Sequence, residues 1–325
     1  MEAVPRRRPA TSVDVARAAG VSQTTVSLVF SGRAAGRVSD RTRELVERTA
    51  AELGYAPNTS ARVLRGGRPQ VLALAVPNVR NEYFSAVLVG GEVAAREQGM
   101  AMLLMDTSDE PDWVERMIDM DRAGMFAGAI VYAQPGEVTA RLAAEVERLV
   151  FVECPEPQGR PAVDLDLAGG MRQVVEHLRA LGHRRIGHAR ADLPRETFRL
   201  RAVHLADELG AEPAHFSSDF DVDEATARAV DFLRANEITA IFCDDDLLAG
   251  AVYRACAQLG RSIPGELSVI GFNDVALTRY LAPELTSVAI PAETVGRLAV
   301  RALLGDDGAL VPLTLRVRAS TAAPR

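Results

Sequence analysis

The sequence predicts an α/β protein in two parts, a small all-helical N-terminal part and a larger two-lobed body built on parallel β-sheets. Up to about residue 64, apolar residues recur at helical spacing. From Val71 onward, short apolar runs alternate with amphipathic helical stretches, a pattern typical of parallel sheets covered by helices. Because this alternation fills most of the 325-residue chain, it exceeds what one sheet usually carries, and we expect two similar lobes.

Three short helices are expected in the N-terminal part. Each follows a hydroxyl side chain that can cap its first turn: Thr11 or Ser12, then Ser22, then Ser39. Gly20 and Gly54 end the first and third helices, because glycine readily takes the left-handed conformation at a helix end. The apolar faces consist of Val13, Val15, Ala16 and Ala19, of Val26 and Val29, and of Leu45, Val46, Thr49, Ala50 and Leu53.

The body shows the alternation of strands and helices directly. The apolar runs expected as strands are VLALAVP, AMLLMD, AGAIVYA, VFVEC, RRIGHAR, AIFCD and LSVIGF. Helices are expected near residues 84–99, 112–123, 169–181, 199–209 and 223–236, with a further one ending at Leu259.

The net charge of −7 is unevenly distributed. Residues 1–67 hold 11 arginines against 6 acidic residues, a net charge of +5, and the rest of the chain holds 26 arginines against 38 acidic residues, a net charge of −12. A basic N-terminal part on an acidic body is typical of a DNA-binding module joined to a part that avoids DNA.

Several classes of protein are disfavoured. Cys154, Cys243 and Cys256 lie far apart without a CxxC pair, which argues against a disulfide framework or a usual zinc site. The N-terminus lacks the apolar segment of a secretory signal, and no apolar run is long enough to span a membrane. We therefore expect a cytoplasmic protein without a membrane partner.

An enzyme is an alternative that the motifs do not favour. The chain has no GxGxxG after a strand, no Walker A motif, no GxSxG and no HExxH, so neither an oxidoreductase nor a hydrolase is indicated and no cofactor is expected. The other alternative is a free ligand-binding protein of a transporter, which the missing secretory signal and the basic N-terminal part disfavour.

The segment DVARAAGVSQTTVSLVFSG carries the sharpest signal. Two short helices meet at Ala19-Gly20-Val21, the arrangement of a helix-turn-helix. The second helix then exposes short polar side chains that can reach base edges and phosphates in a major groove. These exposed positions are Gln23, Thr24, Thr25, Ser27 and Leu28. On pattern alone, an ordinary three-helix bundle with a solvated polar face remains the alternative.

The chain resembles the lac repressor and galactose repressor family along essentially its whole length. The residues that carry the resemblance in the N-terminal part are Thr11, Asp14-Val15-Ala16, Ala19-Gly20-Val21-Ser22, Thr25-Val26-Ser27, Val38-Ser39, Thr42-Arg43, Leu53-Gly54-Tyr55, Pro57-Asn58 and Ala61-Arg62. In the body they are Gly182-His183-Arg184-Arg185-Ile186, Val269-Ile270-Gly271-Phe272, Leu285-Thr286 and Ser320-Thr321-Ala322.

The resemblance implies a sequence-specific repressor that acts as a homodimer on a pseudo-palindromic DNA operator. By resemblance, Gln23 and Thr24 contact bases, and Thr11, Ser22 and Thr25 contact phosphates. Asn58 and Ala61–Leu64 correspond to a hinge helix, with Leu64 as the wedge that enters the minor groove and kinks the duplex. The chain departs from the family at Leu28, where an arginine that reads guanine is usual, so its operator is expected to differ.

For the body, the resemblance implies a fold like that of periplasmic sugar-binding proteins, with a small-molecule effector such as a sugar or related metabolite held between two lobes. We expect a DNA-binding domain over residues 1–57, a hinge helix and linker over 58–69, and an effector-binding and dimerisation domain over 70–325. Lobe one is expected at about 70–162 plus 290–310, and lobe two at about 163–289 plus a final strand near residues 313–317.

Effector contacts carry over position by position. The candidates are Asn78, Tyr83, Phe84, Glu153, Arg201, Phe220, Asp244 and Asn273, most of them at strand ends, where open α/β sheets bind ligands. Each has a plainer interpretation: Arg201 as a surface residue, Phe220 as core, Asp244 as part of a solvated acidic run and Asn273 as a turn cap. At the position of Asp244 the family usually has an amide, and at the position of Asn273 it often has a carboxylate. This chain has the two residue types exchanged.

The run Asp244-Asp245-Asp246 also suggests a magnesium or calcium site, because carboxylates at a strand end bind such ions. Its middle member, Asp245, instead matches a structural position of the family, so we expect no metal. His204 stands where the family usually has glycine, which predicts a narrower or more polar pocket there.

Overall fold

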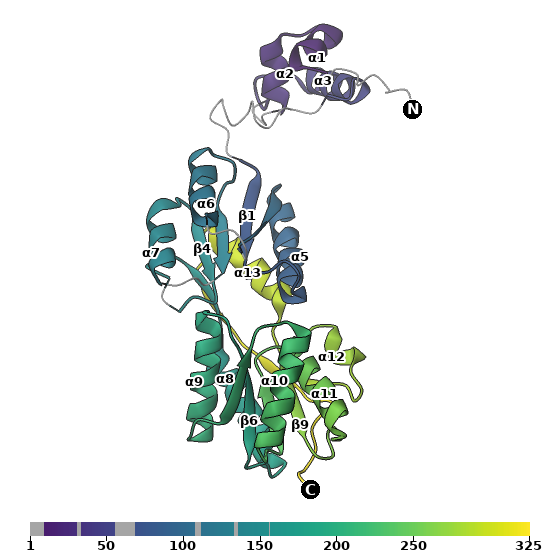
Figure 1. Cartoon of the computed structure of the whole chain (residues 1–325). Coiled ribbons are helices and arrows are strands. Elements are labelled where there is room, and N and C mark those ends of the chain that lie inside the picture. The colour runs from purple at the N-terminus through teal and green to yellow at the C-terminus, as the bar shows by residue number, and fades with distance from the viewer. Residues whose placement is uncertain (1–9, 31–33, 56–68, 108–111, 133–135, 156) are drawn as a thin grey trace. The chain divides into compact units, whose positions relative to one another are not determined.

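The protein is described here by a computed structural model. It describes residues 10–30, 34–55, 69–107, 112–132, 136–155 and 157–325. The chain divides into two compact units, Met1–Pro69 and Gln70–Arg325, which are taken one at a time (Figure 1).

The first unit is helical. Its helices are α1 (Ser12–Ala19), α2 (Gln23–Phe30) and α3 (Asp40–Glu52). Thr11 caps α1 in a reciprocal capping box with Asp14, and Gly20 ends it at φ 68°. The backbone N–H of Thr25 donates to the Ser22 hydroxyl at 3.0 Å, and that of Thr42 donates to Ser39 at 3.2 Å. The helices and caps predicted from the sequence are confirmed.

A small apolar core holds the three helices together. Val15 and Val46 are fully buried, and Val26 is 1% exposed. Alanines at Ala16, Ala19 and Ala50 complete the cluster and let the helices approach closely. Because α1 and α2 lie close across the Gly20 turn, the helix-turn-helix predicted from the sequence is present.

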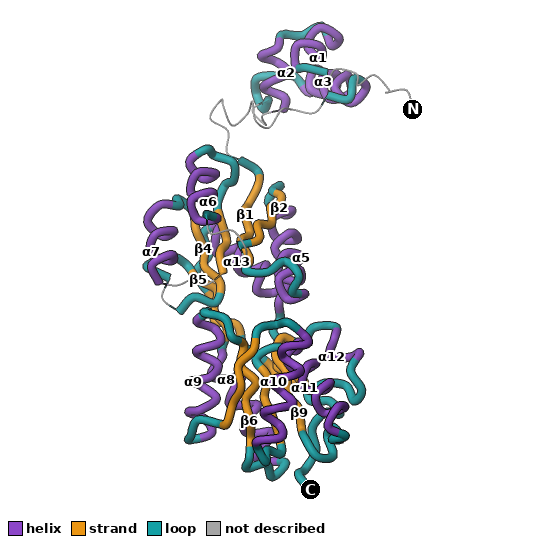
Figure 2. Tube along the Cα trace, in the orientation of Figure 1, coloured by secondary structure: helices purple, strands orange, loops and turns teal. Residues whose placement is uncertain are grey.

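The second unit contains two β-sheets, which Figure 2 shows as two groups of strands. In its described residues, the first sheet has the order β11-β5-β4-β3-β1-β2, with every pair parallel. The strands are β1 (Val71–Val76), β2 (Ala101–Asp106), β3 (Ala129–Tyr132), β4 (Leu149–Val152), β5 (Ala162–Leu165) and β11 (Ala309–Val311).

The second sheet has the order β12-β10-β9-β8-β6-β7. Its strands are β6 (Ile186–Ala191), β7 (Ala214–Ser218), β8 (Ala240–Cys243), β9 (Ser268–Asn273), β10 (Thr286–Ala289) and β12 (Thr314–Arg316). All pairs are parallel except β10 with β12, which is antiparallel. The two parallel sheets confirm the α/β fold class and the two lobes.

One detail of the lobe boundary was wrong. Residues 163–165 were expected in lobe two, but they belong to β5, which pairs with β4 on one side and β11 on the other. A short strand with an alternating burial pattern, Ala162–Leu165, does not reveal from sequence which sheet it joins. The chain crosses to the second sheet only after β5, through α8.

Helices cover the sheets. They are α5 (Glu82–Glu97), α6 (Trp113–Arg122), α7 (Gly136–Glu145), α8 (Leu167–Ala180), α9 (Glu196–Leu209), α10 (Val222–Ala235), α11 (Asp246–Leu259), α12 (Leu277–Tyr280) and α13 (Ala292–Leu304). The helices α5, α6, α8, α9 and α10 begin within three residues of their expected starts, and α11 ends at Leu259 as expected. The helices α7, α12 and α13 were not predicted.

The late helix α13 returns to the first lobe and packs along α5 more extensively than any other helix pair (Figure 1). Glycine makes this contact possible. A Cβ on Gly90 would lie 1.9 Å from the backbone oxygen of Glu293, and one on Gly296 would lie 2.0 Å from that of Val87. The chain returns from the second lobe to the first at α13, and this close packing on α5 holds α13 against the first lobe.

Candidate functional site

The start of α2 presents a polar surface in the first unit. Ser22, Gln23, Thr24 and Ser27 are exposed, and Thr25 and Leu28 are half-buried. The Gln23 amide donates to the Ser12 hydroxyl at 3.0 Å, and the Ser22 and Thr25 hydroxyls lie 2.9 Å apart. Short donors at a helix N-terminus are suited to phosphates and base edges.

Positive charge accompanies this surface. The exposed arginines of the described part of the first unit are Arg17, Arg37, Arg41, Arg43 and Arg48. Two of them, Arg17 and Arg43, make exposed ion pairs with Asp14 and Asp40, and such pairs contribute little stability. The predicted hinge residues Asn58, Ala61 and Leu64 lie outside the described residues.

The second unit has a cavity of about 380 Å³ between its two lobes. Strand ends and helix starts supply its walls, as expected for open parallel sheets. Seven of the eight predicted effector contacts line it, namely Asn78, Tyr83, Phe84, Glu153, Arg201, Phe220 and Asn273. Residues that the sequence analysis missed also line it, among them Asn81, Tyr132, Arg195, Thr197, Phe198 and Asp245.

Aromatic rings from lobe one form one wall. Tyr132 meets Tyr83 and Phe84 edge to face, and Tyr83 and Phe84 are tilted to each other, with centroids 4.8–5.9 Å apart. The Tyr83 hydroxyl donates to Glu153 Oε1 at 2.8 Å, and the Tyr132 hydroxyl donates to that of Tyr83 at 3.2 Å. Burial raises the pKa of both phenols well above the usual range, so they remain neutral donors.

Arg201 supplies the positive charge of the opposite wall. Its side chain is almost completely buried, with the guanidinium 3.6 Å from the ring centroid of Phe272. One terminal nitrogen donates to the backbone oxygen of Asp244 at 2.5 Å, and the other to the Thr197 hydroxyl at 3.3 Å. Its Nε is buried and has no hydrogen-bond partner within the described part of the chain. An unsatisfied buried donor is costly, and one in a native structure is commonly explained by an ordered water or a functional role.

Asp245 and Asn273 form a hydrogen-bonded pair at the cavity wall. The Asn273 amide donates to Asp245 Oδ2 at 2.8 Å, and the Asn81 amide donates to the same oxygen at 3.4 Å. The backbone N–H of Leu247 donates to Oδ1 at 2.8 Å. Burial raises the pKa of Asp245 to about 6, although these hydrogen bonds oppose the shift.

The structure places Asp244 outside this cavity. Its carboxylate is buried away from this cavity and is held by His188 Nε2 at 2.9 Å and by the backbone N–H of Ala191 at 3.0 Å. Asp245, which was interpreted as structural, is the residue that lines the cavity. The reason is local geometry, because β8 ends at Cys243 and successive side chains then turn to different sides.

The third member of the run, Asp246, is also committed to the interior. It accepts hydrogen bonds from the Ser287 hydroxyl at 2.7 Å and the Val275 backbone at 2.9 Å. Burial raises its pKa well above the ordinary value, and the Asp245 charge adds to that shift. In the described residues, no group of His, Cys, Asp or Glu has the arrangement of a metal site.

Two cavity residues have a left-handed backbone that non-glycine residues rarely adopt. Glu153 has φ 55° and Asn273 has φ 104°. Such conformations cost about 1–3 kcal/mol each and concentrate at ligand sites. They aim one carboxylate and one amide from opposite lobes into the same cavity.

Two other sequence interpretations concerned single residues. Phe220 lines the cavity and also packs on the apolar core, with its ring 6.3 Å from that of Phe198, so its role as an effector contact stays a prediction. His204 lines a separate cavity of about 370 Å³ and not the one described here.

No helix in the described residues is long and apolar enough to cross a membrane. A helix-turn-helix joined to a two-lobed α/β body with an interlobe cavity defines a ligand-responsive DNA-binding regulator. The comparisons with known proteins agree. Residues 12–58 match the family described as bacterial regulatory proteins of the lacI family, and residues 175–321 match the periplasmic binding protein-like domain.

The chain is 32% identical to the transcriptional regulator DegA of Bacillus subtilis, over 96% of this chain and 98% of that protein. Its structure is similar to that of the lac repressor dimer bound to operator and the anti-inducer ONPF, with TM-score 0.87, 26% identity, and coverage of 97% of this chain and 100% of that one. It is also similar to the CelR–cellobiose complex, with TM-score 0.69, 28% identity, and coverage of 96% and 100%. The chain belongs to the LacI family of transcriptional regulators.

Proposed function

We propose that this protein is a homodimeric repressor whose affinity for a DNA operator is changed by a small polyhydroxylated molecule bound between the lobes of its body. The observation that carries the proposal is the interlobe cavity of about 380 Å³, whose polar lining includes Arg201, Asp245 and Asn273. The proposal assigns the body binding and no catalysis, and places the protein in the cytoplasm with its DNA.

The cavity has the chemistry of a neutral, hydroxyl-rich ligand. Glu153 and Asp245 accept hydrogen bonds, Asn273 both donates and accepts, and Arg201 donates. The rings of Phe84 and Tyr132 offer an apolar face for the flat side of a sugar ring. Cellobiose in the CelR complex is a ligand of this kind.

In the first unit, the proposal gives base contacts to Gln23, Thr24, Ser27 and Leu28, and phosphate contacts to Thr11, Ser22 and Thr25. Exposure of the polar residues at the start of α2 supports it. Asn58, Ala61 and Leu64 would form the hinge that enters the minor groove. Since one recognition helix reads few base pairs, two copies on a pseudo-palindrome supply the needed specificity.

We assign the dimer contact of the body to an apolar surface on lobe two, here called the α11–α12 surface. Leu247 is 44% exposed and Tyr280 is 84% exposed, beside an apolar hollow lined by Leu248, Leu277 and Leu281. Exposed apolar residues gathered around a hollow are typical of an interface between proteins. The lac repressor, similar to this chain, is a dimer in its operator complex.

The test is a DNA-binding titration on the full chain. An operator is first selected from random duplexes, and its Kd is then measured by fluorescence anisotropy with and without sugars such as ribose and cellobiose, and with nucleosides. We expect one ligand class to change the operator Kd at least tenfold and to raise the thermal midpoint of the protein. Failure to select any DNA sequence, or a midpoint and Kd indifferent to every ligand, would refute the proposal.

A further inference from the structure

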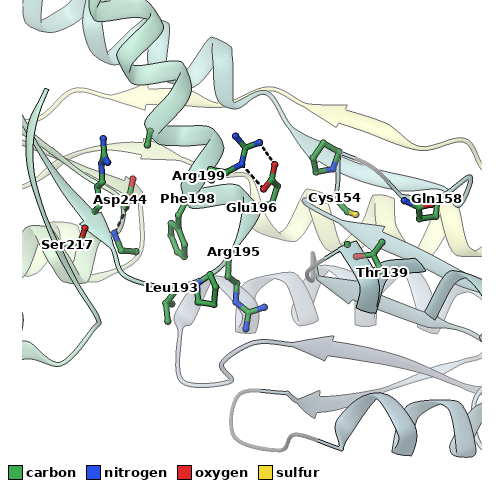
Figure 3. Close-up of a pocket in the computed structure, with 16 residues that line it drawn as sticks. Thr139, Cys154, Gln158, Leu193, Arg195, Glu196, Phe198, Arg199, Ser217 and Asp244 are labelled. Atoms are coloured by element: carbon green, nitrogen blue, oxygen red, sulfur yellow. Dashed lines mark hydrogen bonds and ion pairs between the residues drawn. The ribbon is translucent and has the colours of Figure 1, made fainter. Parts of the chain in front are cut away.

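A second cavity of about 620 Å³ adjoins the cavity described above. Leu193, Arg195 and Phe198, from the start of α9 and the loop before it, line both cavities, so the two spaces meet along these residues. Figure 3 shows Arg195 projecting from this segment, with Thr139, Cys154 and Gln158 of lobe one on the facing side. The second cavity is therefore also built from both lobes.

The two cavities differ in charge. The first is lined by four carboxyl groups, Glu153, Asp219, Asp221 and Asp245, against two guanidinium groups, Arg195 and Arg201. The second is lined by three guanidinium groups, Arg190, Arg195 and Arg199, against the carboxyl groups of Glu196 and Asp244.

The acidic residues of the second cavity are already engaged. Glu196 pairs with Arg199 through both carboxylate oxygens, as Figure 3 shows. The Asp244 carboxylate is 1% exposed and accepts hydrogen bonds from His188 and the backbone of Ala191. Each of the two carboxylates therefore already has hydrogen-bond donors of its own.

A bound anion would add favourable contacts to two of the guanidinium groups, those of Arg190 and Arg195. Arg190 pairs with Glu212, whose side chain is 64% exposed, and such a pair in water is weak enough for a ligand to displace. Burial lowers the pKa of Arg195 and the Glu153 charge opposes that shift, so a second anion near Arg195 would favour its charged form further.

The α9 helix adds to this field. Arg195 is its N-cap residue and makes no side-chain cap hydrogen bond, and Glu196, Phe198 and Arg199 of its first turn line the cavity. The N-terminus of this 14-residue helix carries a partial positive charge toward the same space. The helix dipole and the three arginines are independent features, and both favour a negatively charged ligand.

A series of hydrogen bonds also connects the second cavity to the first. Arg190 Nε donates to His188 Nδ1 at 3.3 Å, and the opposite ring nitrogen of His188 donates to Asp244 at 2.9 Å. The backbone oxygen of Asp244 in turn accepts from Arg201. A group that moves Arg190 can therefore change how Arg201 is held in the first cavity.

We propose that the second cavity is a subsite for an oxyanion, a phosphate or a carboxylate, and that the effector is an anionic sugar derivative whose hydroxyl-bearing ring lies in the first cavity. The inference rests on the proposed function and narrows its ligand class. Planar guanidinium groups bind phosphate and carboxylate oxygens in pairs, and three of them line this space.

The experiment compares each sugar with its anionic derivative on the full chain. Glucose is paired with glucose 6-phosphate and gluconate, ribose with ribose 5-phosphate, and inorganic phosphate is tested alone at matched ionic strength. Thermal midpoints are measured first, and Kd values by calorimetry follow for the ligands that shift them. We expect an anionic member to bind at least tenfold more tightly than its parent sugar.

Arg190→Gln and Arg199→Gln are the test variants, because neither residue lines the first cavity, and Arg228→Gln on the exposed face of α10 is the matched control. Each test variant should weaken the anionic ligand about tenfold and leave the parent sugar within twofold, while the control changes neither. If inorganic phosphate alone shows the same dependence on both arginines, the subsite takes a free anion as well.

Two results would overturn the subsite. One is a neutral sugar that binds and controls DNA affinity while its anionic derivatives bind no better, which leaves the proposed function intact. The other is that no probe, inorganic phosphate included, shifts the midpoint of the unmodified protein more than that of the Arg190→Gln/Arg199→Gln double variant.

Discussion

The guanidinium of Arg201 lies 3.6 Å from the ring centroid of Phe272, at the point where the second sheet meets the interlobe cavity. This stacking, together with the hydrogen bonds to Asp244 and Thr197, holds the group rigidly while its Nε has no partner in the described residues. The protein thus bears the cost of an unsatisfied buried donor in a residue that lines the cavity.

Replacing Arg201 by lysine should abolish the effector response and leave operator binding unchanged without effector. Lysine keeps the charge but cannot stack or donate from three fixed nitrogens. We expect effector affinity to fall by about a hundredfold, measured by calorimetry. The same loss with Arg172→Lys, an exposed arginine of α8 paired with Glu208, would contradict a specific role for Arg201.

The raised pKa of Asp245 gives a prediction for pH. Its native pKa of about 6 lies above the ordinary 3.8, so its contribution to stability is fully present below about pH 4 and is lost as the pH rises through 6. Asp245→Asn removes that loss. The variant's amide has one acceptor oxygen fewer for the Asn273 and Leu247 donors, so the prediction concerns the pH dependence: between pH 4 and 7 the unmodified protein should lose up to about 3 kcal/mol more stability than the variant.

Thermal melts of both proteins from pH 4 to 7 measure this difference. Asp223→Asn serves as the control, because that carboxylate is 83% exposed on α10. A midpoint difference for Asp245→Asn that is constant over the whole pH range, like that of the control, would show that the carboxyl group titrates normally.

For the run Asp244-Asp245-Asp246, only part of the arrangement can be predicted from the sequence. Its position at a strand end was predictable, because an apolar run precedes it and a helical pattern follows. Which of Asp244, Asp245 and Asp246 faces the cavity depends on how the backbone turns after Cys243, and three identical side chains give no pattern from which to read that turn.

The same distinction applies to the fold. The alternation of strands and helices and the helix-turn-helix follow from local spacing, and both are present. The partners of β5 and the docking of α13 on α5 depend on contacts between segments far apart in the chain. Tyr132 ends a predicted strand, yet its neighbours in the cavity, Tyr83 and Phe84, come from a different part of the sequence.

Gly90 should tolerate no side chain. In Gly90→Ala, the new Cβ would meet the backbone of α13 at 1.9 Å, and backbone cannot move aside as a flexible side chain can. We expect a loss of about 3 kcal/mol or more, or failure to fold. The control is Gly250→Ala in α11, where the nearest atom is 3.6 Å away and alanine should be neutral or stabilising by about 0.5–1 kcal/mol. Chemical denaturation measures both, and equal losses would contradict the close helix crossing.

The α11–α12 surface should control dimer formation. Leu247→Asp and Tyr280→Asp place charges where the proposed interface buries apolar side chains, so each should shift the dimer toward monomer by at least a hundredfold in Kd. Sedimentation velocity measures the shift. Val203→Asp on α9, which changes a residue 40% exposed outside this surface, is the control. If both test variants remain dimers, the dimer interface lies elsewhere on the protein.

Leu64 of the hinge lies outside the described residues, and the prediction for it rests on the family resemblance. Leu64 is proposed as the wedge that unstacks one base step at the operator centre, whereas the arginines and hydroxyls of the first unit bind phosphates whatever the sequence. Leu64→Ala should therefore lower operator affinity at least a hundredfold and change the affinity for random duplex little. Anisotropy titrations at 50 and 200 mM salt separate the two, because non-specific binding weakens steeply with salt. The variant's remaining affinity should show that salt dependence equally on operator and random DNA, since only the deformation-dependent contacts have been removed. Equal losses on operator and random DNA would instead mean that Leu64 supports folding of the head or general electrostatic contact, and that sequence specificity resides in α2 alone.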